Sequence, residues 1–536
     1  MKKLALFLLL SIVLNSNAQT SITATIPFQG YDETQAYLGE AEFQIFLDNV
    51  DGVLDKPIIL VDGFDPSDTR DIPAMYNLLS DGNQNLADTL RDEGYDFVLL
   101  NFPVYTRASD NVVVDGGVDY IQRNAMILTE LIDTINNQKV GSEELVIIGP
   151  SMGGLISRYA LRYMEQNSLD HQTRLYVSWD TPHQGANILI GFQYLFNYIA
   201  IQTNDQQLMD GVNASLKSPA SKEMLVDHFL GHLQSGSDFE QDPNLLLPVG
   251  APNFRDAFQN EIDAMGFPQQ VRNISVSNGS GIGITTGSPG VNVINNTFDV
   301  AANTTSDVII NFTPVASQSM VVTDVITRFF GVPIATYTAE SQSTSVSDGL
   351  DASPGGKYDI ASFTNATQGN PILQDFITNL NQSEFCFIPT ISSLAINNEN
   401  NWYASPDIGN THNSPFDAWY VPNANEDHVT LTQANINFVL PEIRNQVVGV
   451  VGNVLTNKYI LKTNPVSNNI TLLLDNSYQY NNVNTKIVDI TGKSLLQNTY
   501  NSVSNEINIP IDLSKGIYFL TISDSQITFS KKIIVK

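Results

Sequence analysis

One serine between two glycines, in Gly149-Pro150-Ser151-Met152-Gly153, marks a candidate nucleophile. The segment follows the apolar run Leu145–Ile148 and precedes residues 154–163, whose apolar side chains recur at helical spacing. A G-x-S-x-G segment between a strand and a helix holds its serine on a sharp turn, with the hydroxyl clear of the sheet. The positive end of the helix then lies beneath the hydroxyl. The glycines are needed because a Cβ at either position would crowd neighbouring backbone.

A serine hydroxyl needs a base within hydrogen-bond reach, and the base needs an acceptor that fixes its tautomer. When a strand, a tight turn and a helix present the serine, the chain order is serine, acid, histidine. His171 and His183 follow the turn too closely to leave room for an acid-bearing strand. His412 and His428 remain, and we predict that His428 is the base because a suitable acid shortly precedes it.

The other residues with metal-binding or redox chemistry give no site. His228 and His232 stand at i and i+4, but no third ligand lies nearby, so we interpret them as ordinary surface histidines. Cys386, between two phenylalanines, is the only cysteine, and we interpret it as a small buried apolar residue. An intrachain disulfide is therefore impossible, and we expect neither a metal nor a cofactor.

Two aspartates compete for the role of the acid. Asp417 lies eleven residues before His428, in a loop that contains proline. Asp348 lies closer to the end of the predicted strand 271–277, where a sheet of this kind often carries its acid. Asp427 is adjacent to His428 and would have difficulty turning back onto the same ring. We predict Asp417, with Asp348 as the alternative.

The oxyanion that forms during acyl transfer needs two backbone N–H donors. One is the N–H of Met152, the residue after the nucleophile. The loop Asp62-Gly63-Phe64 follows an early apolar run, and Gly63 permits close backbone approach. We predict the Phe64 N–H as the second donor; the alternative is that this loop is a plain tight turn.

The elements around these residues alternate between strands and helices. Helical spacing is found near 73–92 and over 119–137, and short alternating stretches in 19–56 predict edge strands. This alternation predicts an α/β fold with a doubly wound, mostly parallel sheet. Its buried strands are predicted at 57–61, 95–101, 145–148, 174–179 and 271–277.

Two long segments interrupt the alternation. Residues 186–265 contain the stretch 188–199, which is apolar nearly all round and fits either a buried helix or a lid over an apolar site. We favour the lid, because the segment lies between core strands where such elements are inserted. Residues 282–382 are rich in Gly, Thr and Ser and predict a β-rich insertion.

Charge and the N-terminal segment point to export. The 536 residues carry a formal net charge of −30, which argues against nucleic acid and anionic membrane surfaces as partners. Residues 1–18 have the basic start, apolar stretch and small residues of a signal peptide. That stretch is too short for a permanent anchor, and no other stretch is a candidate membrane helix. We therefore expect a soluble, exported protein without a transmembrane anchor.

A family resemblance supports this interpretation. Residues 149–155 and 158–161 resemble α/β-hydrolases of the lipase and esterase superfamily, and Asp180–Gly185 is similar to their Thr-Pro-His-x-Gly segment, whose histidine is not the base. The resemblance covers about 57–185 and 271–440. Pro150 and Asp62 depart from it, since many lipases have His at both positions, but the backbone donors stay intact. The acid-then-histidine ending also looks like that of these enzymes.

The C-terminal region differs from the rest. Residues 458–536 alternate between apolar and polar and predict a small all-β sandwich. They resemble the C-terminal sorting domain of type IX secretion cargo in Asn464-Pro465-Val466, Asp489–Lys493, Leu513–Tyr518 and the final Lys-Lys-Ile-Ile-Val-Lys. This resemblance implies the type IX machinery as partner and export through the periplasm to the cell surface or medium.

Together these patterns predict a signal peptide (1–18), an α/β-hydrolase catalytic domain (19–450) and a sorting domain (458–536). The predicted function is a secreted serine ester hydrolase that acts on ester or lipid substrates through an acyl-enzyme on Ser151. A peptidase or polyester depolymerase with the same triad is an alternative within the enzyme class. A surface binding protein on an inactive hydrolase scaffold is an alternative outside it.

Overall fold

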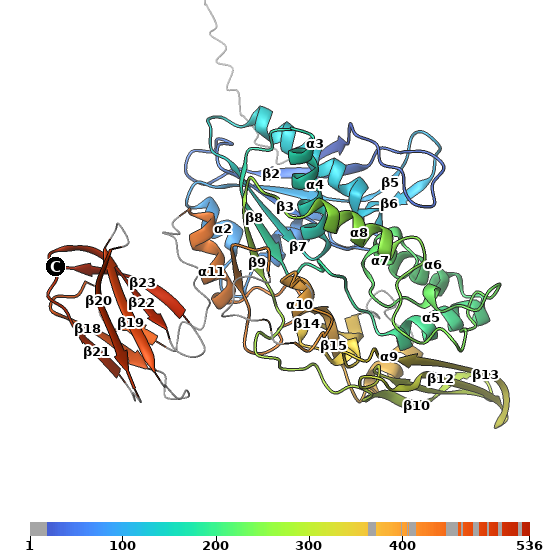
Figure 1. Ribbon diagram of the computed structural model, residues 1–536. Coiled ribbons are helices and arrows are strands. Elements are labelled where there is room, and N and C mark those ends of the chain that lie inside the picture. Colours follow the sequence, from blue (N-terminus) through green and yellow to red (C-terminus); the bar gives the residue numbers. More distant parts are fainter. Residues whose placement is uncertain are drawn as a thin grey trace, which may run out of the picture.

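A computed structural model describes the greater part of the chain (Figure 1). The described residues are 19–362, 371–397, 399–404, 406, 414–445, 459–462, 465–474, 482–489, 493–501, 506–523 and 528–536. The predicted signal peptide 1–18 and the rejected base His412 lie outside them.

An eight-stranded sheet is the centre of the described structure, and its strands are parallel from β4 to β16. The strands β1 and β2 pair antiparallel at one edge, as predicted for 19–56. The spatial order is β1 (Thr20–Thr23), β2 (Glu40–Phe46), β4 (Asp96–Asn101), β3 (Pro57–Val61), β7 (Leu145–Pro150), β8 (Thr173–Trp179), β9 (Arg272–Val276) and β16 (Ala418–Tyr420).

Helices cover both faces of this sheet (Figure 1), because its central strands are apolar on both sides. In β3, Ile59 and Val61 face the core under α3 (Ile121–Gln138) and α4 (Met152–Gln166). Ile58 and Leu60 face the core under α1, α2 and α11. The helical segment predicted near 73–92 is two helices, because the Asn85 side chain caps the second. The bounds are α1 (Ile72–Leu78), α2 (Leu86–Arg91) and α11 (Gln433–Ile443).

Short elements outside the central sheet complete the hydrolase-like region. Antiparallel β14 (Gly355–Asp359) and β15 (Glu384–Pro389) form a pair outside the central sheet. A second small hairpin joins β5 (Val104–Thr106) to β6 (Val113–Asp115). The remaining short elements are η1 (Gly116–Val118), α6 (Gln206–Ser215), α7 (Pro219–Met224), η2 (Phe229–Gly231), α8 (Arg255–Met265), η3 (Leu350–Ala352), α9 (Pro371–Thr378) and α10 (Thr390–Ser393).

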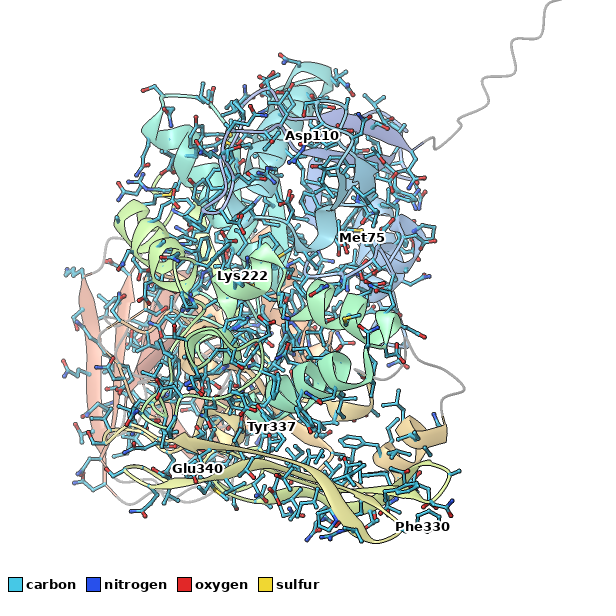
Figure 2. All side chains as sticks on the ribbon, turned by 90° about the vertical axis from the view of Figure 1, so that its right-hand side faces the viewer. Met75, Asp110, Lys222, Phe330, Tyr337 and Glu340 are labelled. Atoms are coloured by element: carbon cyan, nitrogen blue, oxygen red, sulfur yellow. The ribbon has the colours of Figure 1, made fainter. Side chains whose placement is uncertain are left out.

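The β-rich insertion is a four-stranded antiparallel sheet, and the apolar segment 188–199 falls in α5 (Ile190–Thr203), which packs on it. Thr323 Oγ1 donates to the Gly191 carbonyl (2.7 Å), and the Tyr198 and Tyr337 rings stack at 4.3 Å. Figure 2 shows Tyr337 on the inner part of this sheet and Phe330 at its far end. In this structure α5 is a buried helix, and its role as a lid stays a prediction. The strands are β10 (Asn292–Ala301), β11 (Thr304–Asn311), β12 (Ser319–Phe329) and β13 (Val332–Gln342).

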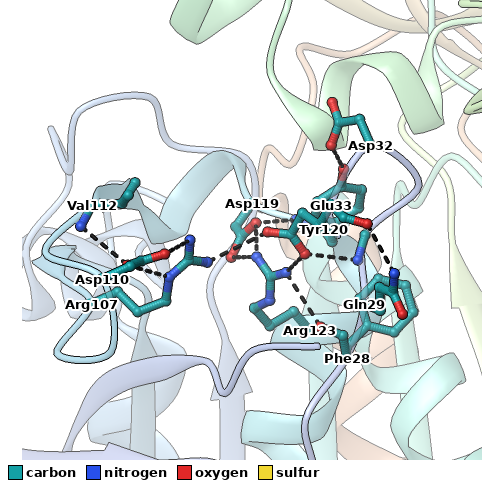
Figure 3. A network of polar contacts seen from close by, with 11 residues as sticks. Phe28, Gln29, Asp32, Glu33, Arg107, Asp110, Val112, Asp119, Tyr120 and Arg123 are labelled. Carbon is teal, nitrogen blue, oxygen red and sulfur yellow. Dashed lines mark hydrogen bonds and ion pairs between the residues drawn. The ribbon is translucent and has the colours of Figure 1, made fainter. Parts of the chain in front are cut away.

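A network of ion pairs fixes the N-terminal segment against α3 (Figure 3). Arg123 on α3 donates to Asp119 (2.8 Å) and pairs with Glu33, which also pairs with Arg107 (3.4 Å). Arg107 in turn donates to Asp110 (2.7 Å). Because each guanidinium has carboxylate partners, the network tolerates burial, and it holds the lead-in to the sheet in place.

The C-terminal region is a separate all-β unit with its own apolar core (Figure 1). Among the described residues it forms two antiparallel sheets, in the orders β17-β18-β21 and β20-β19-β22-β23. No helix in the described ranges is long and apolar enough to cross a membrane. The strands are β17 (Tyr459–Leu461), β18 (Asn469–Leu474), β19 (Val483–Asp489), β20 (Ser494–Tyr500), β21 (Glu506–Pro510), β22 (Gly516–Ser523) and β23 (Thr528–Val535).

Candidate active site

Ser151 lies on a strained turn between β7 and α4. Its φ is 52° and its ψ is −129°, a backbone conformation that non-glycine residues rarely adopt. The Ser151 N–H donates to the Trp179 carbonyl (2.8 Å), which holds the turn against the end of β8. Serine at a helix N-cap ordinarily accepts a bond from the first turn, but the Ser151 side chain makes no such bond. Its hydroxyl is therefore not engaged in capping α4.

The two glycines of the turn are required by sterics. A Cβ on Gly149 would lie 2.6 Å from the Gly153 carbonyl oxygen. A Cβ on Gly153 would lie 2.4 Å from the Val61 carbonyl oxygen, at the end of β3. Both distances are below any van der Waals contact, and both obstacles are backbone that cannot rotate away. The crowding inferred from the sequence is thus present at both positions.

Asp180 is the carboxylate that meets His428. It directly follows β8, whose last residue, Trp179, stands opposite Pro150 in the parallel pairing with β7. Ser151 and Asp180 are therefore one residue beyond two neighbouring strand ends. His428 Nδ1 donates to Asp180 Oδ2 (2.7 Å), and the Asp180 side chain is fully buried. This bond fixes the tautomer that leaves Nε2 free to accept a proton.

Several groups hold Asp180 in place. The Asn278 N–H donates to Asp180 Oδ1 (3.1 Å), so each carboxylate oxygen has a donor. Gly356 on β14 packs so closely that a Cβ there would lie 2.0 Å from Asp180 Oδ2. On the other side of the pair, the Phe387 ring meets the His428 ring edge to face, with centroids 4.9 Å apart. The insertion strands β14 and β15 thus form a wall of the site.

The two acids predicted from the sequence lie elsewhere, which corrects the choice of Asp417. Asp417 is exposed and precedes β16, where its Oδ2 accepts from the Asn273 N–H (2.8 Å). Because β9 and β16 are parallel, this contact is at the amino end of the strands, opposite the edge that carries Ser151. Asp348 accepts from the Ala316 N–H (2.7 Å) within the β-rich insertion. Neither carboxylate is placed to orient His428.

Positive φ values are found at Asp180 and next to His428 as well as at Ser151. Asp180 has φ of 45°, and Val429, directly after His428, has φ of 61°. A positive φ is exceptional for a β-branched residue, and such outliers cluster at functional sites. The residues next to Ser151, Asp180 and His428 also line one apolar pocket. Its lining includes Pro150, Trp179, Val429, Asp62, Met75 and Leu79.

The predicted oxyanion loop lies against Ser151. A Cβ on Gly63 would lie 3.3 Å from Ser151 Cβ and 3.8 Å from its Oγ. The N–H of Met152 is at the first position of α4, where helix geometry supplies no acceptor. The structure therefore brings the Phe64 loop and the start of α4 to the same side chain.

An acid beneath this loop fixes its shape. Asp62 Oδ1 accepts from the Gly63 N–H (2.8 Å) and from Arg70 Nε (2.9 Å). Arg70 also reaches the Phe64 carbonyl (3.4 Å). Burial raises the pKa of Asp62 to about 6, and the nearby Arg70 charge partly offsets that rise. Where the resembling lipases carry histidine, this chain therefore has a buried aspartate that hydrogen-bonds the loop backbone.

A second titratable group lies near the Asp180–His428 pair. Glu426 is half-buried, and its Oε2 accepts from Asn278 Nδ2 (2.8 Å). Asn278 thus contacts both Glu426 and Asp180. Burial raises the pKa of Glu426 to about 7, and the charge of Asp180 adds to the rise.

His183, His228 and His232 are buried and hydrogen-bonded away from Ser151. His183 is buried with its Nε2 2.8 Å from Ser178 Oγ, and burial together with Arg158 lowers its pKa well below the usual value. His228 and His232 were expected at the surface, which is wrong: both are buried and hydrogen-bonded, to the Leu216 carbonyl and to Asp227 respectively. Burial lowers the pKa of His228 to about 4. The described part of the chain holds no cluster of three or more metal-binding side chains.

Comparison with known families agrees with this architecture. Residues 55–229 match the family described as the PGAP1-like alpha/beta domain. Residues 464–536 match the family described as the secretion system C-terminal sorting domain. No curated protein matches the chain.

Solved structures of esterases and hydrolases resemble the chain weakly. Est1E from Butyrivibrio proteoclasticus is 10% identical over 44% of this chain and 72% of its own, with a TM-score of 0.23. LipA, a rice cell wall degrading esterase from Xanthomonas oryzae, is 11% identical over 48% and 74%, with a TM-score of 0.26. The peroxisomal hydrolase Lpx1 from Saccharomyces cerevisiae is 13% identical over 48% and 73%, also with 0.26. Scores of this size carry no argument about chemistry. The two family matches, however, show that the chain combines a PGAP1-like α/β-hydrolase domain with a C-terminal type IX secretion sorting domain, which indicates a secreted or cell-surface protein.

Proposed function

We propose that the protein is a secreted serine hydrolase that cleaves carboxylic esters through an acyl-enzyme on Ser151. The observation that carries the proposal is the hydrogen bond between His428 and the buried Asp180, one residue beyond the strand that pairs with the Ser151 strand. A serine on a strained turn, a histidine of fixed tautomer and a buried carboxylate are the parts of a serine-hydrolase triad. Their chain order, serine, acid and histidine, is that of α/β-hydrolases.

In the proposed mechanism, Ser151 Oγ attacks the ester carbonyl while His428 Nε2 accepts the hydroxyl proton. Asp180 stabilises the imidazolium that forms and keeps its ring oriented. The N–H groups of Met152 and Phe64 donate to the oxyanion of the tetrahedral intermediate. His428 then returns the proton to the leaving alcohol. A water activated by the same histidine releases the carboxylic acid and restores Ser151.

The surroundings favour an apolar ester. The pocket beside the triad candidates is lined by aliphatic, aromatic and thioether side chains, with Asp62 as its charged member. Asp62 directs one oxygen to its own loop and to Arg70. We place lipid or other apolar esters ahead of peptides because the side chains next to the triad candidates are mostly apolar, although the triad chemistry itself would serve both.

A fluorophosphonate probe tests the proposal directly, because it reacts only with an activated serine. The wild type should be labelled at Ser151, whereas Ser151→Ala should stay unlabelled. Ser157→Ala is the matched control: Ser157 lies on the same helix with its hydroxyl donating to the Gly153 carbonyl (2.7 Å), so this variant should label normally. A series of p-nitrophenyl esters of increasing chain length then measures acyl preference. An unlabelled wild type that hydrolyses none of them would contradict the proposal.

A further inference from the structure

A group of exposed apolar side chains gathers at the far end of the β-rich insertion. Phe330 is 69% exposed, and Val332 and Ile334 are each 62% exposed. Phe329 (45%) and Val300 (37%), near the end of the neighbouring strand β10, complete the group. The register places them together, since Phe329 pairs with both Thr304 and Val332. We call these five residues the hairpin tip; Figure 2 shows Phe330 at its end, where the hairpin projects from the body.

The turn of the hairpin tip contains an aromatic residue in a backbone conformation that aromatic residues rarely adopt. Phe330 and Gly331 are the two loop residues between β12 and β13, with φ of 48° and 79°. Two-residue turns with both φ values positive prefer Asn-Gly or Asp-Gly, because an aromatic side chain is disfavoured in the left-handed region. The chain therefore places an exposed aromatic ring at a strained position where a polar residue would fit more easily. Strain kept at an exposed site points to a function outside the fold.

Charge narrows the choice of partner. Residues 329–339 contain no charged side chain. The nearest cation in β12, Arg328, pairs with Asp307 (2.9 Å). The whole chain carries a net charge of −30, so an anionic surface would repel it. A polar or charged protein surface offers nothing for the hairpin tip to bind, whereas the uncharged apolar layer beneath zwitterionic headgroups accepts Phe, Ile and Val side chains.

The size of the hairpin tip favours a lipid surface over a second copy of this chain as its binding partner. Its exposed parts cover on the order of 400 Å², about half of the roughly 800 Å² per partner that a stable protein interface buries. The group lies at the projecting end of the four-stranded sheet (Figure 2). Insertion into a lipid surface needs no complementary pocket, because binding scales with the apolar area that leaves water.

We infer that the hairpin tip is an anchor that inserts into zwitterionic lipid surfaces and holds the exported protein there. Phe330 and Phe329, whose rings meet edge to face with centroids 4.6 Å apart, form the leading wedge. Val332, Ile334 and Val300 follow into the acyl boundary. The inference is independent of the chemistry proposed for Ser151, and it assigns the insertion a role that the central sheet does not supply.

Vesicle flotation with the full chain carrying Ser151→Ala tests the anchor without interference from hydrolysis. This protein should float with phosphatidylcholine vesicles. Adding Phe329→Thr and Phe330→Asn should reduce the bound fraction at least tenfold, and the fold should persist because Asn suits the turn and Thr suits the strand. Adding Val112→Thr and Val113→Thr instead is the matched control: these valines are 46% and 68% exposed, at the β5–β6 hairpin, so binding should not change.

A spectroscopic variant locates the contact. Phe330→Trp keeps an aromatic ring at the hairpin tip, and its emission should be quenched by brominated phosphatidylcholine. Val113→Trp should not be quenched. Of the native tryptophans, Trp179 and Trp419 are buried and Trp402 is half-buried, so quenching is measured relative to the Ser151→Ala protein without an added tryptophan. The inference is overturned if the starting protein does not float, if the Phe329/Phe330 variant floats equally well, or if Phe330→Trp is not quenched. It is also overturned if sedimentation shows a dimer that the same two substitutions abolish.

Discussion

Asp180 and His428 are 248 residues apart in the chain and are joined by a hydrogen bond of 2.7 Å. The partner of the histidine is thus supplied by the strand next to the nucleophile strand, and it is set by the pairing of Trp179 with Pro150. The intervening chain contains both insertions and also the last two strands of the central sheet, β9 and β16. The β14–β15 pair then covers the bond, with Gly356 against the carboxylate and Phe387 against the imidazole.

Asp180→Asn is expected to lower kcat for a p-nitrophenyl ester by about 10³- to 10⁴-fold, because an amide favours the wrong imidazole tautomer. Asp417→Asn should leave kcat within about threefold of the wild type, since Asp417 is exposed and contacts the Asn273 backbone at the opposite end of the strands. The measurement is steady-state hydrolysis, with circular dichroism to show that both variants fold. The assignment fails if Asp417→Asn loses more activity than Asp180→Asn.

The sequence contained an indication that Asp180 is the acid, but we expected the acid to lie further from Ser151 in the chain. Four of the six residues in the run 174–179 that precedes it are apolar or aromatic, and an acid at the end of the strand beside the nucleophile is within reach of a histidine there. We instead predicted the acid further along the chain, at Asp417 or alternatively at Asp348. We therefore interpreted Asp180–Gly185 only as a segment similar to lipases. Which parallel strand lies beside which is decided by long-range packing, and a sequence pattern does not encode it.

Sequence patterns were more informative for features that depend on interactions within one segment. The glycines around Ser151, the helix 121–138 and the buried run 57–61 depend on sterics and apolar periodicity within one segment. His228 and His232 hydrogen-bond instead to Leu216 and Asp227, 12 and 5 residues earlier, and their i, i+4 spacing gives no indication of these contacts or of their burial. The strain at Val429 has no sequence signal, because a valine gives no indication of a positive φ.

Arg70→Gln is expected to lower kcat for a short soluble ester by about tenfold while KM changes little. A full oxyanion donor is worth about 10²- to 10³-fold, and this variant loosens the Phe64 loop without removing its N–H. Without Arg70, the pKa of Asp62 should rise above its value of about 6, because the guanidinium is what lowers it. The pH at which activity is half-maximal should therefore move upward.

Arg328→Gln is the control for this experiment, since Arg328 forms an ion pair on the β-rich insertion. Its kcat and pH profile should match those of the wild type. An Arg70→Gln enzyme with unchanged kcat would show that the Phe64 loop does not take part in catalysis.

Gly153→Ala is expected to destabilise the fold by about 1 to 3 kcal/mol, as overpacking does, and to abolish fluorophosphonate labelling. The added methyl would meet the Val61 and Asp62 carbonyl oxygens at 2.4 and 2.7 Å, so the end of β3 and the oxyanion loop must move. Gly211→Ala on α6 is the control, because nothing lies within 4 Å of its Cβ position. Because alanine is favoured over glycine within a helix, Gly211→Ala should raise the free energy of unfolding by about 0.5 to 1 kcal/mol. Thermal unfolding of both variants, monitored by circular dichroism, distinguishes the effect of steric crowding from the general effect of replacing a glycine in a helix.

Glu426→Gln is expected to make the protein increasingly more stable than the wild type as the pH rises. The pKa of Glu426 is raised by burial from 4.5 to about 7, so between these values the unfolded chain ionises while the folded protein keeps the proton. The unfolded state then binds fewer protons, and the wild type loses stability across this window. Glutamine does not ionise and keeps an oxygen for the Asn278 amide, which donates to Glu426 at 2.8 Å.

The difference in Tm between Glu426→Gln and the wild type should therefore grow from pH 5 to pH 8 and stay constant above it. Allowing for the partial exposure of the side chain, we expect the difference in unfolding free energy to grow by about 1 to 2 kcal/mol over this pH range. Glu240→Gln, at an exposed glutamate, should show no such trend. If the Glu426→Gln difference is instead flat with pH, the carboxyl is ionised in the folded protein and a negative charge stands permanently beside Asp180. Asn278, which contacts both acids, would then be the group that keeps the two charges apart.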